Sequence, residues 1–212
     1  PTFLLSWMRK IEAEKLKTLK YMVVGAEKLR DEVAKAFEEK YGLSPLEGYG
    51  ATELSPVGAI NIPDLDWPGV KQKGTKRGTV GQPVPGVYMK VVDPDTGREL
   101  ANDEPGLLLV KGPNVMKGYL DDPAKTAEAM RDGFYVTGDI ARIDEDGFVT
   151  LTDRLSRFSK IAGEMVPHVK VEECLHESVG ALDALFVVAG VPDEKRGERL
   201  VVLHKEGVNP EA

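Results

Sequence analysis

The sequence predicts an α/β segment with parallel strand pairing, followed by a small β subdomain and then by part of a small α+β domain. A short apolar strand at Tyr21–Ala26, an amphipathic helix at 27–42 and a second strand at 43–49 form the pattern of a βαβ unit. After Val87, short strands separated by turns dominate. The chain has 212 residues, of which 42% are hydrophobic, so it can bury a sizeable core.

The first elements follow from apolar periodicity. Residues up to about Lys20 are typical of a helix. The helix at 27–42 places an apolar stripe on one face and ends at Gly42; the stripe consists of Leu29, Val33, Ala36 and Phe37. Residues 61–86 are rich in Gly, Pro and Lys and are predicted to be a loop.

The β subdomain is predicted from alternating strands and turn residues. Two strands at 87–93 and 106–112 flank a turn that contains Asp95–Gly97. Asp122 and Pro123 provide the N-cap and first position of a short helix. Residues 134–154 are predicted to form a hairpin. Its turn is expected at Asp144–Gly147. We expect a small mixed or barrel-like β subdomain.

The last part is predicted to be a small domain after a linker. The basic stretch 154–166 has few apolar anchors and is a candidate linker. A helix at 169–179 and strands at 184–191 and 199–207 follow it. Residues 209–212 resemble the start of another helix. Both ends of the chain therefore look cut, and we expect a piece of a longer protein.

Composition excludes several classes of protein. The formal net charge of −7 argues against a broad nucleic-acid surface. A single cysteine, Cys174, excludes a disulfide framework and a cysteine zinc cluster within the chain, and we expect it to be buried apolar filler. The three histidines lack metal-ligand spacing. No apolar run approaches the roughly 20 residues that span a bilayer, so no transmembrane segment is expected here.

Two glycine-bearing segments, Gly25–Glu27 and Gly48–Glu53, each follow a predicted parallel strand. The carboxyl ends of parallel strands share one sheet edge, where ligands of open α/β sheets bind. Glycines expose the backbone, the Thr52 hydroxyl can hydrogen-bond a phosphate, and the Glu53 carboxylate can hold a divalent cation. The alternative is a plain turn that caps a helix.

Four segments together resemble the acyl-adenylate-forming enzymes, in the family's order and spacing: Val23–Leu29, Glu47–Glu53, Lys111–Thr126 and Phe134–Arg154. The resemblance implies that residues 1–154 are the C-terminal part of the large AMP-binding domain. Residues 155–212 would then contain the hinge and an incomplete small domain. It also implies ATP and Mg²⁺, a fatty acid that attacks the α-phosphate of ATP, and a phosphopantetheine thiol that accepts the acyl group.

The resemblance implies roles for individual residues. Glu53 matches the Mg²⁺ ligand, Thr52 the hydroxyl on the α-phosphate and Arg154 an arginine that reaches ribose or phosphate. Asp139 matches the carboxylate that accepts hydrogen bonds from the ribose hydroxyls. Asp139 could instead cap a turn, and Arg154 could be one half of a surface ion pair.

Further positions are implied to line the nucleotide site, with Tyr49 beside the adenine: Gly25, Ala26, Glu27, Gly48, Tyr49, Gly50 and Ala51. Lys160 and Gly163 lie on a basic stretch that approaches the thiol donor in the family. Ser156 aligns with the hinge residue, where the family usually has Asp or Lys. Tyr49 could instead belong to the core, and Lys160 with Arg157 could be a solvated face.

The segment 157–166 looks most like the acyl-ACP synthetase part of bifunctional 2-acylglycerophosphoethanolamine acyltransferase/acyl-ACP synthetase, because Gly163 is followed by Glu164, Met165 and Val166. This implies acyl carrier protein as the acceptor and a lysophospholipid as partner of a missing domain. The expected location is cytoplasmic, with the whole protein at the cytoplasmic face of the inner membrane.

Two alternatives remain: a generic long-chain fatty acyl-CoA synthetase, and a non-catalytic nucleotide-binding module. The family's phosphate loop would precede Pro1, and its catalytic lysine would follow Ala212. We therefore expect that the 212 residues alone do not form acyl-adenylate.

Overall fold

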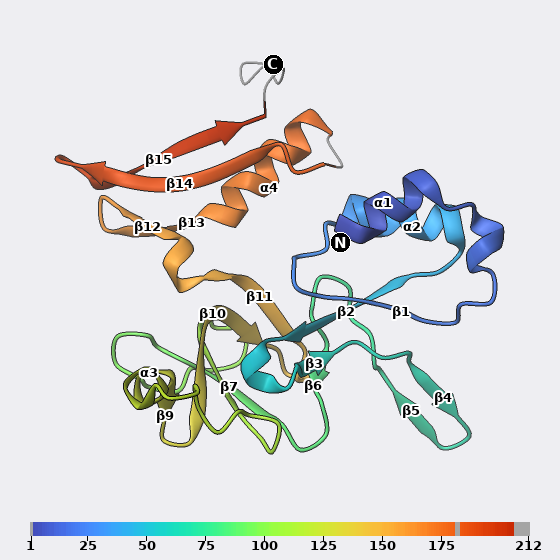
Figure 1. Cartoon of the computed structure of the whole chain (residues 1–212), viewed down its shortest axis with the longest axis horizontal. Coiled ribbons are helices and arrows are strands. Elements are labelled where there is room, and N and C mark those ends of the chain that lie inside the picture. Colours follow the sequence, from blue (N-terminus) through green and yellow to red (C-terminus); the bar gives the residue numbers. More distant parts are fainter. Residues whose placement is uncertain (1, 181–182, 206–212) are drawn as a thin grey trace. The chain divides into compact units, whose positions relative to one another are not determined.

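The computed structural model describes residues 2–180 and 183–205, and it divides into two compact units. Unit 1 contains the residues up to 137 together with 141–151, and unit 2 contains 138–140 together with the residues from 152 onward (Figure 1). The helix start predicted at 209–212 lies outside the described residues. The predicted domains, 1–154 and 155–212, stay a prediction.

Unit 1 begins with the predicted βαβ arrangement. Its elements are α1 (Thr2–Lys10), the 3₁₀ turn η1 (Ala13–Leu16), β1 (Met22–Val24), α2 (Asp31–Tyr41) and β2 (Pro45–Gly50). Strands β1 and β2 pair in parallel, with Val23 opposite Leu46. The predicted parallel pairing is therefore confirmed.

Helix α2 forms because its apolar stripe is buried and its end is capped. Val33 and Phe37 are buried in a cluster with Leu4, Val24, Leu29 and Ala34. Gly42 has a φ of 66°, and its N–H donates to Glu38 O. The predicted helix and its glycine stop are confirmed, but the helix begins at Asp31, so Leu29 precedes it, and Ala34 is buried in place of Ala36.

The first helix is shorter than predicted. Helix α1 ends at Lys10 instead of near Lys20, and only the short turn η1 follows. Three apolar residues follow Lys10 in this stretch, and they are at most half-buried: Ile11, Leu16 and Leu19. Without a buried face, this stretch lacks the packing that stabilises most helices. The Tyr41 hydroxyl donates to Trp7 O and Ile11 O, so it bonds carbonyls where α1 ends.

After β2, the chain makes a short turn and returns as β3 (Val57–Ile60), which pairs antiparallel with β2. The turn is η2 (Thr52–Leu54), and the sheet order is β1-β2-β3-β6, with β6 (Gln82–Pro83). Residues 61–86 are not all loop, because Leu65–Trp67 (β4) and Val70–Gln72 (β5) form a hairpin around Gly69. Both strands are exposed and have only three residues each, which is too short for an alternation of apolar and polar residues to identify them.

The β subdomain is a five-stranded sheet in the order β11-β10-β8-β7, with β9 paired to β10. Its elements are β7 (Tyr88–Val92), β8 (Gly106–Lys111), α3 (Pro123–Ala129), β9 (Met130–Arg131), β10 (Phe134–Ile143) and β11 (Val149–Arg154). The Asp122 side chain accepts from Lys125 N, and Gly147 N donates to Asp144 O. The predicted helix cap and hairpin turn are confirmed.

In unit 2, the predicted linker 154–166 is mostly ordered strand, so that interpretation was wrong. After η3 (Leu155–Arg157), β12 (Phe158–Ile161) and β13 (Glu164–Pro167) form a hairpin, and the sheet order is β13-β12-β15-β14. The hairpin is anchored by a polar residue, since Ser159 is fully buried and its hydroxyl lies 2.8 Å from Nε2 of His168. Hydrophobic patterning does not reveal such an anchor.

Helix α4 (His168–Val179) packs against strand β14 (Phe186–Asp193), which pairs with β15 (Gly197–His204) (Figure 1). His176 is buried in a T-shaped ring contact with Phe186. Cys174 is exposed, so the expectation of buried filler was wrong. The described part of α4 buries His168 and His176 instead, which the apolar pattern could not indicate.

Candidate functional site

The predicted site residues of unit 1 lie where β1 and β2 end. Gly25 follows β1, and a Cβ there would lie 3.1 Å from Gly48 O, so the two glycine-bearing segments are in close contact. The Glu27 carboxylate accepts a 2.8 Å hydrogen bond from Thr2 Oγ1. The expected meeting of these segments at one sheet edge is therefore seen.

Gly50 is required for the turn that carries Thr52 and Glu53. A Cβ at Gly50 would lie 2.0 Å from Pro56 O, so any side chain would push apart the two strands that meet there. The Ala51 N–H donates to the same Pro56 oxygen. The close approach of Pro56 O therefore explains why a glycine occupies position 50, whether or not a ligand binds there.

Tyr49 is buried in the larger core cluster of unit 1, with only 8% of its surface exposed. The core alternative therefore describes its packing, and its role beside adenine stays a prediction. Thr52 is exposed, while Glu53 is half-buried.

Glu53 is fixed through both its backbone and its side chain. Met116 N donates to Glu53 O at 2.8 Å, and the Tyr119 hydroxyl donates to Glu53 Oε1 at 2.8 Å. A hydrogen bond from its own backbone amide and the bond from Tyr119 hold the pKa of the Glu53 carboxyl below its usual value. Glu53 is therefore ionised at neutral pH.

An ionised, oriented carboxylate is a ligand that Mg²⁺ accepts. No group of three or more His, Cys, Asp or Glu suited to a metal occurs among residues 2–180 and 183–205. Mg²⁺ commonly binds through one or two carboxylates with substrate phosphates and water, so Glu53 fits that mode and an all-protein metal cage does not.

In unit 2, Asp139 and Arg154 form an ion pair. Arg154 Nε lies 3.3 Å from Asp139 Oδ1; the Asp139 side chain is 12% exposed and the Arg154 side chain is 73% exposed. Asp139 lies on β10 and Arg154 ends β11, so these two strands bring together two residues that were predicted separately. The ion pair also agrees with the alternative that Arg154 is one half of a surface ion pair. The roles of Asp139 and Arg154 in binding ribose therefore stay predictions.

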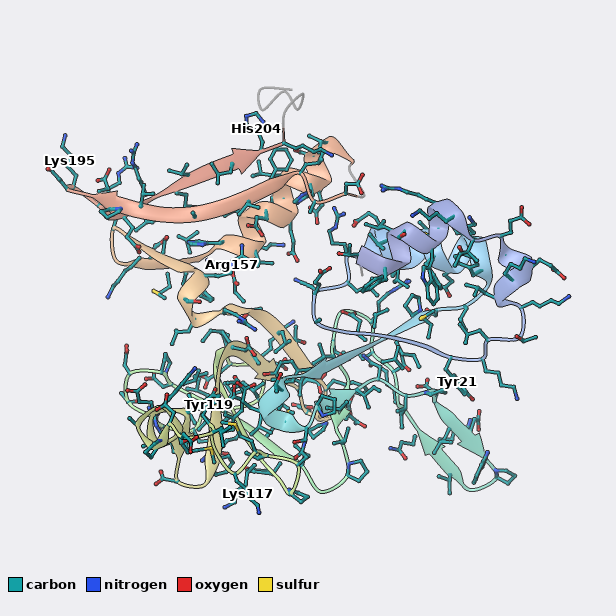
Figure 2. The ribbon with its side chains drawn as sticks, viewed as in Figure 1. Tyr21, Lys117, Tyr119, Arg157, Lys195 and His204 are labelled. Carbon is teal, nitrogen blue, oxygen red and sulfur yellow. The ribbon has the colours of Figure 1, made fainter. Side chains whose placement is uncertain are left out.

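The remaining predicted residues of unit 2 lie on or beside the β12–β13 hairpin. Lys160 is exposed, and its backbone N–H donates to Glu198 Oε2 at 2.6 Å. Gly163 has a φ of 94° at the hairpin turn, a conformation that favours glycine. Ser156 is exposed within η3. Arg157 (Figure 2) pairs with Glu172, so it is not simply a solvated side chain.

Two hollows in unit 1 lie beside other residues. A cavity of about 210 Å³ is lined by residues of α2, β2 and the loop 75–78, including Glu47. An open hollow of about 450 Å³ lies at Tyr119 and the start of α3. Neither is lined by a predicted site residue. Within the described part of the chain, no helix has the length and apolar character needed to cross a membrane.

Sequence reasoning missed two residues that hold the Glu53 turn. Tyr119 lies in a segment that carried the resemblance, but no role was assigned to it. Asn114 Nδ2 donates to Leu54 O at 2.9 Å and to Val57 O at 2.8 Å. Only the tyrosine and asparagine in the segment 111–126 could have signalled these contacts, since their partners lie about 60 residues away.

Comparisons with known proteins identify the family of the chain. The profile of the AMP-binding enzyme family matches residues 1–120. The chain is 38% identical to a long-chain-fatty-acid–CoA ligase of Bacillus subtilis, over 90% of this chain and 33% of that protein. It is 36% identical to 4-coumarate–CoA ligase 1 of Arabidopsis thaliana, over 93% of this chain and 35% of that protein. The chain thus spans about a third of the length of the curated relatives it matches.

Solved structures of other enzymes have a similar fold. ATP-bound MatB from Rhodopseudomonas palustris superposes with a TM-score of 0.81 at 32% identity, over 98% of this chain and 40% of that one. The amide bond synthetase McbA from Marinactinospora thermotolerans gives 0.81 at 28% identity, over 99% and 42%. The predicted fold class is confirmed. Because the family profile covers more than half of the residues, the chain belongs to the AMP-binding enzymes.

Proposed function

We propose that these residues are part of an ATP-dependent ligase that activates a fatty acid as its adenylate and passes the acyl group to a thiol. The similarity to long-chain-fatty-acid–CoA ligases over most of this chain carries the proposal. Because the chain spans about a third of those proteins, the activity is proposed for the complete protein that contains it.

The substrates proposed are ATP with Mg²⁺ and a long-chain fatty acid. The similarity to MatB in its ATP-bound form supports the nucleotide. Mg²⁺ would neutralise phosphate charge, and Glu53 would hold it there. Thr52 would donate to the α-phosphate. Chemistry of this kind depends on positioning and charge neutralisation, so no covalent nucleophile such as Cys174 is needed.

Asp139 and Arg154 are proposed to bind the nucleotide. A carboxylate accepts hydrogen bonds from ribose hydroxyls, and a guanidinium donates to oxygen. The backbone at Gly25–Glu27 and Gly48–Ala51 is proposed to line the adenine, where glycines allow close approach. Residues 1–154 are proposed to belong to the large domain, and 155–212 to the small domain with its hinge at Ser156.

The thiol acceptor best supported is coenzyme A, because the relatives are named as CoA ligases. A second candidate is acyl carrier protein, in a cytoplasmic enzyme that reacylates a lysophospholipid at the inner membrane. The observation that favours it is the segment 157–166, in which Glu164 and Met165 follow Gly163 at the exposed tip of the β12–β13 hairpin. Lys160 on that hairpin is proposed to approach the thiol donor.

The deciding experiment incubates the complete protein with ATP, Mg²⁺ and palmitate, with either CoA or phosphopantetheinylated acyl carrier protein. Mass spectrometry then measures the thioester, and pyrophosphate exchange into ATP measures the first step. Acyl-CoA alone supports the first candidate, and acyl-carrier-protein thioester alone supports the second. Binding of AMP without any exchange would show a non-catalytic nucleotide-binding module and overturn the proposed function.

A further inference from the structure

Tyr119 joins two segments of unit 1 that are far apart in sequence. The Tyr119 side chain is labelled in Figure 2. The Tyr119 hydroxyl donates to Glu53 Oε1 at 2.8 Å, and 66 residues separate the two positions. Through the hydroxyl, Tyr119 acts on one oxygen of the carboxylate that is proposed to bind Mg²⁺.

The ring of Tyr119 is itself held in place by α3. Tyr119 N donates to Thr126 Oγ1 at 2.9 Å, and Thr126 Oγ1 donates to Asp122 O at 2.8 Å. The Lys125 ammonium lies 4.5 Å from the centre of the Tyr119 ring, within the range of a cation–π contact. Contacts at the backbone and at the ring face leave the hydroxyl a defined direction.

The same segment also holds the backbone of the Glu53 turn. Met116 N donates to Glu53 O, and Asn114 Nδ2 bridges Leu54 O and Val57 O. Residues 114–119 therefore fix the backbone of the Glu53 turn, and Tyr119, together with a hydrogen bond from Tyr135, directs the Glu53 carboxylate. A carboxylate fixed in this way loses little conformational entropy when it meets a cation.

We propose that Tyr119 is a positioning residue that orients the Glu53 carboxylate for Mg²⁺. The proposal rests on the proposed function, because that function supplies the Mg²⁺. Partners of metal ligands commonly change metal affinity by about 10–100-fold when they are removed. Tyr119 stands in that relation to Glu53, because its hydroxyl contacts the carboxylate.

The first test uses the metal-free complete protein and does not depend on activity. NMR titration of ¹³C-labelled glutamate, with Glu53→Gln to identify the signal, follows the Glu53 carboxyl. Tyr119→Phe removes one hydroxyl and should raise the pKa of Glu53. The matched control is Tyr88→Phe, since Tyr88 is 54% exposed on β7, and it should leave that pKa unchanged.

The second test measures the Mg²⁺ concentration that gives half-maximal ATP binding, by calorimetry. Tyr119→Phe should raise it about tenfold, and Tyr88→Phe should not change it. In the Glu53→Gln protein, adding Tyr119→Phe should have no further effect, because the hydroxyl acts through that carboxylate. A merely structural tyrosine would weaken binding by the same factor in both backgrounds and lower the melting temperature.

The outcomes separate the two proposals. An unchanged Glu53 pKa, or equal factors in both backgrounds, overturns the positioning role while Mg²⁺-dependent ATP binding by the wild type upholds the proposed function. If the wild type binds no ATP with Mg²⁺, the proposed function is wrong and the positioning role for Mg²⁺ is wrong with it.

Discussion

Replacing Asp139 by asparagine should separate nucleotide binding from stability. The substitution keeps the shape of the side chain and removes its charge. The Arg154 side chain is 73% exposed and the Asp139 side chain is 12% exposed, so solvent screens the pair only in part. Because asparagine keeps one oxygen that can accept hydrogen bonds, the free energy of unfolding should fall by about 1 kcal/mol.

The effect on nucleotide binding should be larger. A hydrogen bond to a charged group is worth about 1.5–3 kcal/mol, and each 1.4 kcal/mol is a factor of ten in affinity. If the ribose hydroxyls donate to Asp139, its loss of charge should raise the Kd for AMP about 10- to 100-fold. Isothermal titration of the complete protein with AMP measures this change.

The matched control is Asp144→Asn. Asp144 Oδ1 accepts from Asp146 N at 3.0 Å and from Phe148 N at 2.9 Å, and its other oxygen pairs with Lys76. Loss of its charge should cost about 1 kcal/mol of stability and leave AMP affinity unchanged. The reasoning is refuted if both substitutions weaken AMP binding equally, or if Asp139→Asn leaves it unaltered.

Three further predictions concern unit 1 and helix α4. Leu108 is fully buried, so Leu108→Ala should lower the free energy of unfolding in urea by about 2–5 kcal/mol, whereas Leu120→Ala, at a position that is 90% exposed, should change it by less than about 0.5 kcal/mol. Burial raises the pKa of the Glu47 carboxyl above its usual 4.5, so the folded state loses stability as the pH rises above 4.5. Glu47→Gln should therefore raise the free energy of unfolding at pH 7. If the free energy of unfolding were raised equally at pH 3, burial of the charge would not be the cause. Cys174 is exposed, so in the native protein it should react with iodoacetamide at about the rate of a free thiol in solution, as followed by mass spectrometry. If Cys174 reacted only after denaturant was added, its exposed placement would be wrong.

The sequence predicted those elements whose stability comes from apolar periodicity or local caps. The parallel pair β1–β2, the helix α2 with its Gly42 stop and the Asp122 cap of α3 are of this kind. The hairpin β4–β5 was missed because each strand has only three residues, all exposed, which is too short for a periodic pattern to be recognised. The hairpin β12–β13 was mistaken for a linker because its anchor is a buried serine.

The site divides in the same way. Glu53 and Asp139 were proposed from motifs that resemble a family, and the structure adds the partners that hold them. Tyr119 lay beyond sequence reasoning because its partner is 66 residues away and a tyrosine in a mixed segment carries no periodic signal. Long-range hydrogen bonds of this kind depend on the tertiary fold.

The three residues 138–140 belong to unit 2 although unit 1 surrounds them in the sequence. A smaller unit produced alone from the predicted boundary after Arg154 would lack these residues and also 152–154. Asp153 would be lost, and its Oδ2 accepts from Val169 N at the start of α4. Separate production of the smaller unit is therefore best attempted by grafting 138–140 ahead of residue 152 through a short glycine bridge, instead of by a single cut.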